Sequence, residues 1–263
     1  MALASAVLFA GCARLPKTGS GTAARDRFLK EYTAAHEARR GVGSISMKRA
    51  GKGRGSARVR WAANAESLAV VGYVGPSRAL EASLQGDSLF IVIRHYDVGV
   101  AGSLRPEEGL DARLLRFLAT PWDFSHVWVR GALERAAIEE SDGGWLLRGQ
   151  LGEGARFTFE LSRRGEPRSL SLRRAGERQD GIVVRYGPER NYHAGRIPSW
   201  IEWSFSGSVM LLHLEDFAPA DVSKIRYGPP VQAEWRILAL DEPDGQALVR
   251  WLLGISEGGR EEP

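Results

Sequence analysis

The sequence predicts a mainly β protein in which one antiparallel sheet curls on itself. Short segments with apolar residues at alternating positions follow one another along most of the 263 residues, and turns that contain glycine separate them. Hydrophobic residues make up 43% of the chain and charged residues 26%, which is enough apolar material to bury a substantial core. A sheet that curls in this way has a concave face. Either the protein's own side chains fill that face, or a ligand occupies it.

The first twelve residues differ in character from the rest of the chain. Residues 2–11 are apolar or small and uncharged, no Lys or Arg precedes them, and Cys12 is the only cysteine. A membrane-spanning helix needs about 20 apolar residues, so this run is too short to cross a bilayer, but its length fits a secretory signal. The segment from Leu8 to Cys12 resembles the lipobox of bacterial lipoproteins, in which cleavage precedes a cysteine that is then acylated. We therefore expect a signal peptide over residues 1–11, lipid attachment at Cys12 and a flexible linker over residues 12–24. A buried N-terminal segment with a core thiol is the alternative.

The first half of the remaining chain reads as a helix followed by strands. A helix is expected over residues 25–40, because Phe28, Leu29 and Tyr32 share one face and Gly41 can end the helix. The apolar period then changes to two, which predicts strands over residues 42–47, 58–61, 68–74, 79–85 and 88–95. A second helix is expected after Pro106, where leucines at positions 110, 114, 115 and 118 are in helical register.

The second half repeats the strand pattern. Strands are expected over residues 132–140, 144–151, 155–162, 168–174, 181–186, 200–205 and 208–217, with a last strand over residues 231–240. Asp244 is expected to cap a short helix that Gly254 ends. One β domain would therefore span residues 25–240, and residues 241–263 would form a short C-terminal helix and a polar tail.

This order of elements is similar to that of the outer-membrane lipoprotein-localisation chaperones LolA and LolB and of the LolB-like lipoproteins. The similarity covers residues 25–218 and is one of pattern, carried by these stretches: Gly41-Val42-Gly43-Ser44-Ile45 after the first helix, Arg58-Val59-Arg60-Trp61, Gly72-Tyr73-Val74-Gly75-Pro76, the leucine-containing helix, and Arg196-Ile197-Pro198-Ser199-Trp200-Ile201. The resemblance implies an incomplete, unclosed β-barrel with helical lids and an apolar interior that holds acyl chains. In LolB a protruding apolar loop residue enters the membrane, whereas the turn Gly75-Pro76-Ser77-Arg78 offers no such residue.

Strand parity selects the side chains that would face this interior. Successive residues of a strand point to opposite faces, and several predicted strands have one apolar side opposite a side that carries Arg or Glu. Together with the resemblance, this pattern predicts an acyl-chain cavity lined by Val59, Trp61, Leu80, Leu84, Phe157, Phe159, Trp203 and Phe205.

Other function classes find little support in the sequence. The five histidines form no HExxH motif or closely spaced pair, so no metal site is expected. No GxSxG motif is present, the only thiol is assigned to lipid attachment, and the adjacent carboxylates Glu139 and Glu140 would point to opposite faces of a strand. The glycines between residues 51 and 55 lack the Walker pattern and indicate a hairpin turn. The net charge of +4 comes from scattered arginines, which argues against a nucleic-acid partner. We therefore expect no catalytic residues and no cofactor.

These observations lead to two functional expectations. The first is a lipid-anchored, periplasm-facing protein of the bacterial outer membrane that binds acyl chains of lipoproteins or lipids and acts in their trafficking, with a periplasmic carrier protein as a candidate partner. In enterobacteria an Asp after the acylated cysteine retains lipoproteins in the inner membrane, and here Ala13 follows Cys12. The second expectation is a non-catalytic envelope scaffold lipoprotein that binds a protein partner. A hollow sheet favours the first, and a solidly packed one favours the second.

Overall fold

The structure is a computed structural model of the chain, and it describes residues 20–32, 38–49, 52–64, 66–104, 127–151, 155–174, 181–205, 207–221 and 235–252. The expected signal peptide, Cys12, the leucine-containing helix after Pro106 and Gly254 lie outside the described residues.

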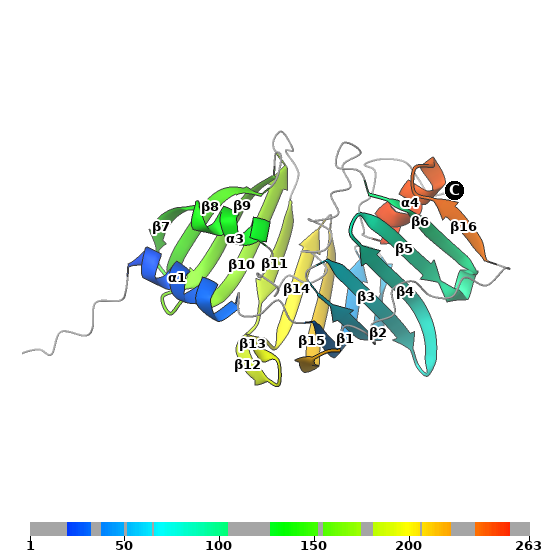
Figure 1. Cartoon of the computed structure of the whole chain (residues 1–263), viewed down its shortest axis with the longest axis horizontal. Helices are drawn as coiled ribbons and strands as arrows, with labels where there is room; N and C mark the ends of the chain where they lie inside the picture. Colours follow the sequence, from blue (N-terminus) through cyan, green and yellow to red (C-terminus); the bar gives the residue numbers. More distant parts are fainter. Residues whose placement is uncertain are drawn as a thin grey trace, which may run out of the picture.

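Fourteen strands form one large sheet that does not close (Figure 1). Its order is β16-β6-β5-β4-β3-β2-β1-β15-β14-β11-β10-β9-β8-β7, so β16 and β7 are its two ends. The strands are β1 (Arg39–Arg49), β2 (Lys52–Ala63), β3 (Ser67–Val74), β4 (Ser77–Gln85), β5 (Ser88–Ile93), β6 (Val98–Ser103), β7 (Ala137–Ser141), β8 (Gly144–Leu151), β9 (Ala155–Ser162), β10 (Pro167–Arg174), β11 (Ile182–Tyr186), β14 (Trp200–Phe205), β15 (Ser208–Pro219) and β16 (Arg236–Ala239). The mainly β, unclosed architecture expected from the sequence is confirmed.

The two halves of the chain meet in the middle of the sheet. Strands β1 to β6 pair with their sequence neighbours, and β7 to β11 do the same. Strand β15 returns from the second half and pairs with β1 along its whole length. Strand β16 pairs with β6 in parallel orientation, while the other strand pairs of this sheet are antiparallel. The sheet is therefore mostly antiparallel, as expected, with one parallel pair at its β16 end.

Three α-helices, one 3₁₀ turn and a small hairpin complete the described fold. They are α1 (Gly21–Tyr32), α3 (Val127–Glu134), α4 (Pro243–Leu252), η1 (Arg94–Tyr96), β12 (Glu189–Tyr192) and β13 (Gly195–Pro198). Helices α1 and α3 lie at the β7 end of the sheet, and α4 lies at the other end beside β6 and β16 (Figure 1). The described helices therefore lie at the two ends of the sheet.

Two expected elements differ from the structure. The first helix begins at Gly21 and ends at Tyr32, and β1 already starts at Arg39. Gly41 does not end a helix, because it lies in β1, where the Trp61 ring occupies the space that a side chain would need. The expected strand over residues 132–140 is also wrong at its start, since α3 continues to Glu134. The buried residues Val129 and Ala136 each lie three or four positions from buried Ala132 and Leu133, which is the period of a helix.

The sequence reading missed β6, β12 and β13. Strand β6 contains two glycines in six residues, and glycine is depleted in strands because it has no side chain to pack. Strands β12 and β13 have four residues each, which is short for a strand signal. By contrast, the strands expected over residues 144–151, 155–162 and 200–205 match β8, β9 and β14.

One hydrophobic cluster connects both halves of the sheet and the helices. It contains buried side chains from α1, from α3 and from strands of both halves. Phe28, Phe159 and Phe217 are among its largest fully buried side chains. The core thus lies along one face of the sheet, which we call the inner face.

Candidate functional site

Strand register shows which residues of the second half share the inner face. Residues directly opposite each other on paired strands project to the same side of a sheet. Phe159 of β9 is opposite Leu170 of β10, which is opposite Val184 of β11. Val184 is in turn opposite Trp203 of β14, and Trp203 is opposite Met210 of β15. These five side chains therefore form one row across the inner face.

The same row continues into the first half through the β1–β15 pair. Met210 is opposite Met47 of β1. Alternate residues of β1 project to the same face, so Gly41 shares the face of Met47, and Gly41 is opposite Trp61 of β2. Trp61 is opposite Val70 of β3, which is opposite Ala82 of β4. Leu80 and Leu84 are the alternate positions on either side of Ala82, so they also project to the inner face.

All eight side chains proposed from parity therefore lie on one face. Six of them are buried in the hydrophobic cluster: Val59, Trp61, Leu84, Phe157, Phe159 and Trp203. Phe205 is half-buried and packs against the cluster, and Leu80 is half-buried. Their role as the lining of an acyl-chain cavity stays a prediction.

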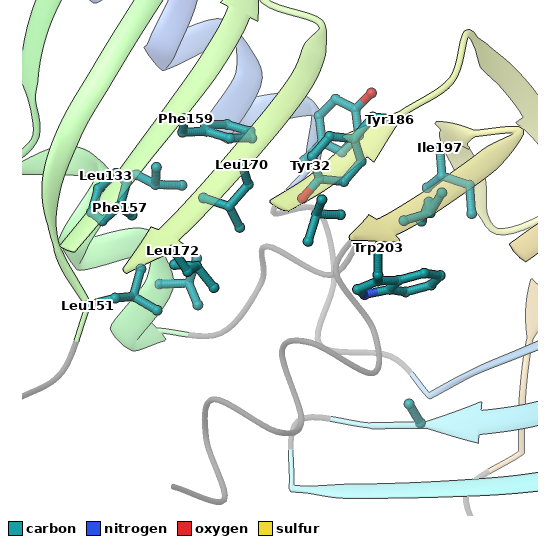
Figure 2. Packing of buried hydrophobic residues seen from close by; sticks show 14 of the residues in the cluster. Tyr32, Leu133, Leu151, Phe157, Phe159, Leu170, Leu172, Tyr186, Ile197 and Trp203 are labelled. Atoms are coloured by element: carbon teal, nitrogen blue, oxygen red, sulfur yellow. The ribbon is translucent and has the colours of Figure 1, made fainter. Parts of the chain in front are cut away.

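Helices α1 and α3 cover the inner face over β7 to β11, a region that we call the covered zone. Phe159 is fully buried, and its ring centroid lies 5.0 Å from that of Phe28 on α1 and 6.2 Å from that of Tyr186 on β11. Figure 2 shows Phe157 and Leu170 in the same packed group as Leu133 of α3. The helices' own side chains therefore fill this half of the concave face.

Polar contacts hold α1 in place over the covered zone. Ser20 precedes the helix, and its hydroxyl oxygen accepts a hydrogen bond from the Ala23 N–H at 3.3 Å, as a helix N-cap does. Arg25 donates to the carbonyl oxygen of Glu134 at 2.8 Å, which joins α1 to the C-terminal end of α3. Arg27 donates to the carbonyl oxygen of Arg164 at 3.4 Å, in the turn between β9 and β10. The helix is thus attached to two different neighbours.

A buried polar cluster makes a further attachment at the C-terminal end of α1. The Tyr32 hydroxyl donates to the carboxylate of Glu189 on β12, and the Arg196 guanidinium of β13 contacts the same carboxylate. The Glu189 side chain is only 4% exposed, and Arg196 also contacts Glu166 at 3.4 Å. Burial raises the pKa of Glu189 above its ordinary value, while the Tyr32 hydrogen bond and Arg196 lower it. Burial and Glu189 together raise the pKa of Tyr32, so its hydroxyl remains a donor.

Half-buried apolar side chains also lie on the inner face outside the covered zone, where they pack against the core cluster. We call these six the open zone: Ile45 on β1, Val70 on β3, Leu89 and Ile91 on β5, Phe205 on β14 and Met210 on β15. Each of them keeps part of its surface accessible to solvent. The sequence reading missed five of these six residues, although Val70 and Ile91 lie in strands that it predicted. Within the covered zone, Ile138, Trp145, Ala155 and Ile182 are half-buried as well.

The opposite face of the sheet is mostly polar. Cross-strand ion pairs join Arg58 to Glu215 at 3.0 Å and Arg185 to Glu202 at 2.8 Å, and their arginine side chains are well exposed. Exposed pairs of this kind contribute little to stability. They fit the expectation that arginines occupy the outer face. Glu81 differs, because it lies on the outer face yet is buried, and Arg94 contacts its carboxylate.

An exposed apolar residue precedes the turn between β3 and β4. The turn Gly75-Pro76-Ser77-Arg78 was expected to offer no protruding apolar residue, and the exposed apolar residue found here lies just before it. Val74, the last residue of β3, is 59% exposed, and Gly75 follows it with a φ of 60°. The positive φ is readily adopted by glycine and allows a tight turn that leaves Val74 at its tip.

Among the residues that the structure describes, no three His, Cys, Asp or Glu side chains lie close enough together to hold a metal ion. No described helix is long and apolar enough to cross a membrane.

Comparison with known proteins gives likeness in structure alone. No family model matches the chain, and no curated protein matches its sequence. A LolA superfamily protein from Nitrosomonas europaea has a TM-score of 0.54 at 13% identity, covering 78% of this chain and 96% of that one. A domain assigned to outer membrane lipoprotein sorting from Vibrio parahaemolyticus has a TM-score of 0.52 at 9% identity, covering 78% and 94%. A DUF1329 family protein from Desulfovibrio piger has a TM-score of 0.52 at 8% identity, covering 78% and 93%. The chain therefore shares its fold with LolA superfamily and lipoprotein-sorting structures.

Proposed function

We propose that this protein is a lipid-anchored protein of the bacterial envelope that binds acyl chains on its inner face and acts in lipoprotein or lipid trafficking to the outer membrane. The observation that carries the proposal is the open zone, where apolar side chains of a concave sheet remain half-buried. The likeness of the fold to lipoprotein-sorting structures supports the same function. Cys12 would supply the anchor, and the binding face would lie on the periplasmic side.

The open zone has the chemistry that acyl-chain binding requires. Each methylene removed from water contributes about 0.8 kcal/mol, and a long chain is held in a bilayer by on the order of 10 kcal/mol. A carrier competes with the bilayer only through a comparably apolar surface. The open zone consists of Ile, Val, Leu, Phe and Met side chains. The covered zone is occupied by α1 and α3, so the ligand would bind to the open zone.

A matched pair of valines gives the sharpest test. Val70 and Val71 are neighbours on β3 and both are half-buried, but Val70 faces the open zone and Val71 faces the outer side. The experiment titrates a fluorescent fatty-acyl probe against Cys12→Ser protein carrying Val70→Asn or Val71→Asn. Placing an amide against an acyl chain costs about 1–3 kcal/mol, so Val70→Asn should weaken binding by about 5- to 150-fold. Val71→Asn should leave it unchanged.

A second pair of neighbouring residues repeats the test in case one of the Val70 or Val71 variants does not fold. Met210 and Leu211 are consecutive on β15 and both half-buried, and Met210 belongs to the open zone. Met210→Gln should weaken probe binding, and Leu211→Gln should not. Circular dichroism checks that each variant is folded. A folded parent protein that does not bind the probe would contradict the carrier and favour an envelope scaffold instead.

The lipid anchor has its own test. Mass spectrometry of the N-terminus of protein purified from its native host should find a chain that begins at an acylated Cys12. An unmodified Met1 or an unmodified Cys12 would contradict the anchor while leaving acyl-chain binding by the sheet to be judged by the titration.

A further inference from the structure

The edge of the large sheet at β6 is occupied by a segment from the far end of the chain. Strand β16 pairs with β6 in parallel, with Ile237 opposite Gly99 and Ala239 opposite Ala101. The Arg236 N–H donates to the Asp97 carbonyl at 2.9 Å, and the Leu240 N–H donates to the Ala101 carbonyl at 2.9 Å. These backbone bonds satisfy an edge that would otherwise present unpaired groups to other strands.

Two glycines shape β6 to receive this segment. A Cβ at Gly99 would lie 2.8 Å from Ile237 Cδ1, and a Cβ at Gly102 would lie 2.5 Å from Leu240 Cβ. Both distances are shorter than side-chain contacts allow, so each glycine is a notch for one aliphatic residue. Residues 99 and 102 point to opposite faces of the sheet. Packing of Ile237 against Gly99 on one face and of Leu240 against Gly102 on the other therefore fixes the register of the segment.

The outer face adds an aromatic contact beside the edge. Trp235 is 8% exposed, and the Arg94 guanidinium carbon lies 5.2 Å from the centre of its ring, a cation–π arrangement. Arg94 also contacts the buried carboxylate of Glu81 on β4, which holds the guanidinium in place. The edge therefore recognises a definite pattern: an aromatic at position 235 and aliphatic residues at positions 237 and 240.

The segment's attachment to the sheet is small and lies at the end of the chain. Strand β16 has four residues, and parallel pairing is slightly weaker per residue than antiparallel pairing. Helix α4, which follows it, contacts β6 and β16. Residues 222–234 connect the segment to the rest of the chain and lie outside the described residues. An extended segment added to a sheet edge makes the same contacts whether it comes from the same chain or from another copy.

We propose that the β6 edge is a strand-addition site, and that a second copy of this chain can fill it by exchanging residues 235–252. The contacts identify the occupant, because the spaces at Gly99 and Gly102 and the position beside Arg94 fit this chain's own Ile237, Leu240 and Trp235. The resident segment belongs to the same chain, so it competes with the incoming one at an effective concentration on the order of millimolar. Exchange should therefore increase with protein concentration. It is independent of acyl-chain binding.

A disulfide trap distinguishes exchange from permanent occupation by the same chain. Ala101 and Ala239 are opposite each other and project to the same face, and adjacent strands lie about 4.8 Å apart, which a disulfide can bridge. In a Cys12→Ser background, one protein carries Ala101→Cys and a second carries Ala239→Cys. The two are mixed at increasing concentration and oxidised gently. A protein with both substitutions serves as the positive control and should form the bond within one chain.

The expected result is a covalent dimer whose yield rises with concentration and whose disulfide joins positions 101 and 239 by peptide mass spectrometry. Gly102→Val in the Ala101→Cys partner should abolish this dimer, because the notch for Leu240 is filled, whereas Ser103→Val at an exposed neighbouring position should not. Mixing Ala239→Cys with Ser141→Cys on the opposite end of the sheet should give no such dimer. If the positive control forms its bond and the mixture stays monomeric at every concentration, the proposal is overturned.

Discussion

Phe159→Ala tests whether the covered zone is a packed core. The Phe159 side chain is fully buried, and its ring lies 5.0 Å from that of Phe28 and 6.2 Å from that of Tyr186. Removing a buried phenylalanine ring costs about 3–5 kcal/mol, because the apolar transfer energy is lost and a cavity remains. With a urea m-value of about 3 kcal/mol/M, the unfolding midpoint should fall by about 1–1.7 M. Tryptophan fluorescence during urea unfolding measures this directly.

Thr158→Ala is the matched control, since Thr158 is the next residue on β9, is half-buried and faces the other side of the sheet. Surface substitutions of this kind change the unfolding free energy by about 0.5 kcal/mol or less. If Phe159→Ala shifts the midpoint no more than Thr158→Ala does, the side chain does not hold α1 on the sheet. The packing of the covered zone would then be refuted.

Three other predictions concern stability. Tyr32→Phe should lower the unfolding free energy by about 1–3 kcal/mol, because it removes the hydroxyl hydrogen bond to buried Glu189, and urea unfolding measures the loss. Burial raises the folded-state pKa of Glu189, so its contribution to the free energy of unfolding should be present at low pH and be lost as the pH rises from about 4 through that pKa. If the free energies of unfolding of the parent protein and of Glu189→Gln change with pH in parallel, this prediction is contradicted. Gly41→Ala should destabilise by about 1–3 kcal/mol because a Cβ would overlap the Trp61 ring, whereas Gly55→Ala, with open space around it, should not, as thermal unfolding of both would show.

The strands that could be predicted are those whose signal is local. In β9, Phe157, Phe159 and Leu161 are buried while Arg156 is exposed, so the alternation in the sequence matches the two faces of the strand. The same parity placed the residues of β2, β4 and β14 on one face of the sheet. Strand parity is a property of the backbone and needs no knowledge of the partner strand.

The elements that could not be predicted depend on distant residues. Gly41 follows two arginines and has the local appearance of a helix end, but Trp61 from the next strand occupies the space beside it. The glycines of β6 weaken its strand signal, and their purpose becomes clear only when Ile237 and Leu240 lie against them. In both cases tertiary packing overrides the local preference.

The sequence predicted which face of the sheet carries the candidate site, but it did not predict how much of that face the helices cover. Parity placed Trp61, Phe159 and Trp203 on the inner face, but it could not show that α1 and α3 would cover one half of that face. Phe159 therefore belongs to a packed region beneath Phe28, whereas Val70 and Met210 lie outside the covered zone and are half-buried. Which helix covers which strands depends on contacts between residues far apart in the sequence.

Photo-cross-linking with an acyl chain tests the central claim most directly. A fatty acid with a diazirine near its methyl end is bound to folded Cys12→Ser protein and irradiated, and the labelled peptides are identified by mass spectrometry. The account predicts labels on the open zone, at or beside Ile45, Val70, Ile91 and Met210, and competition by unlabelled fatty acid. Labels confined to the outer face or the covered zone, or no saturable labelling at all, would contradict acyl-chain binding on the open inner face.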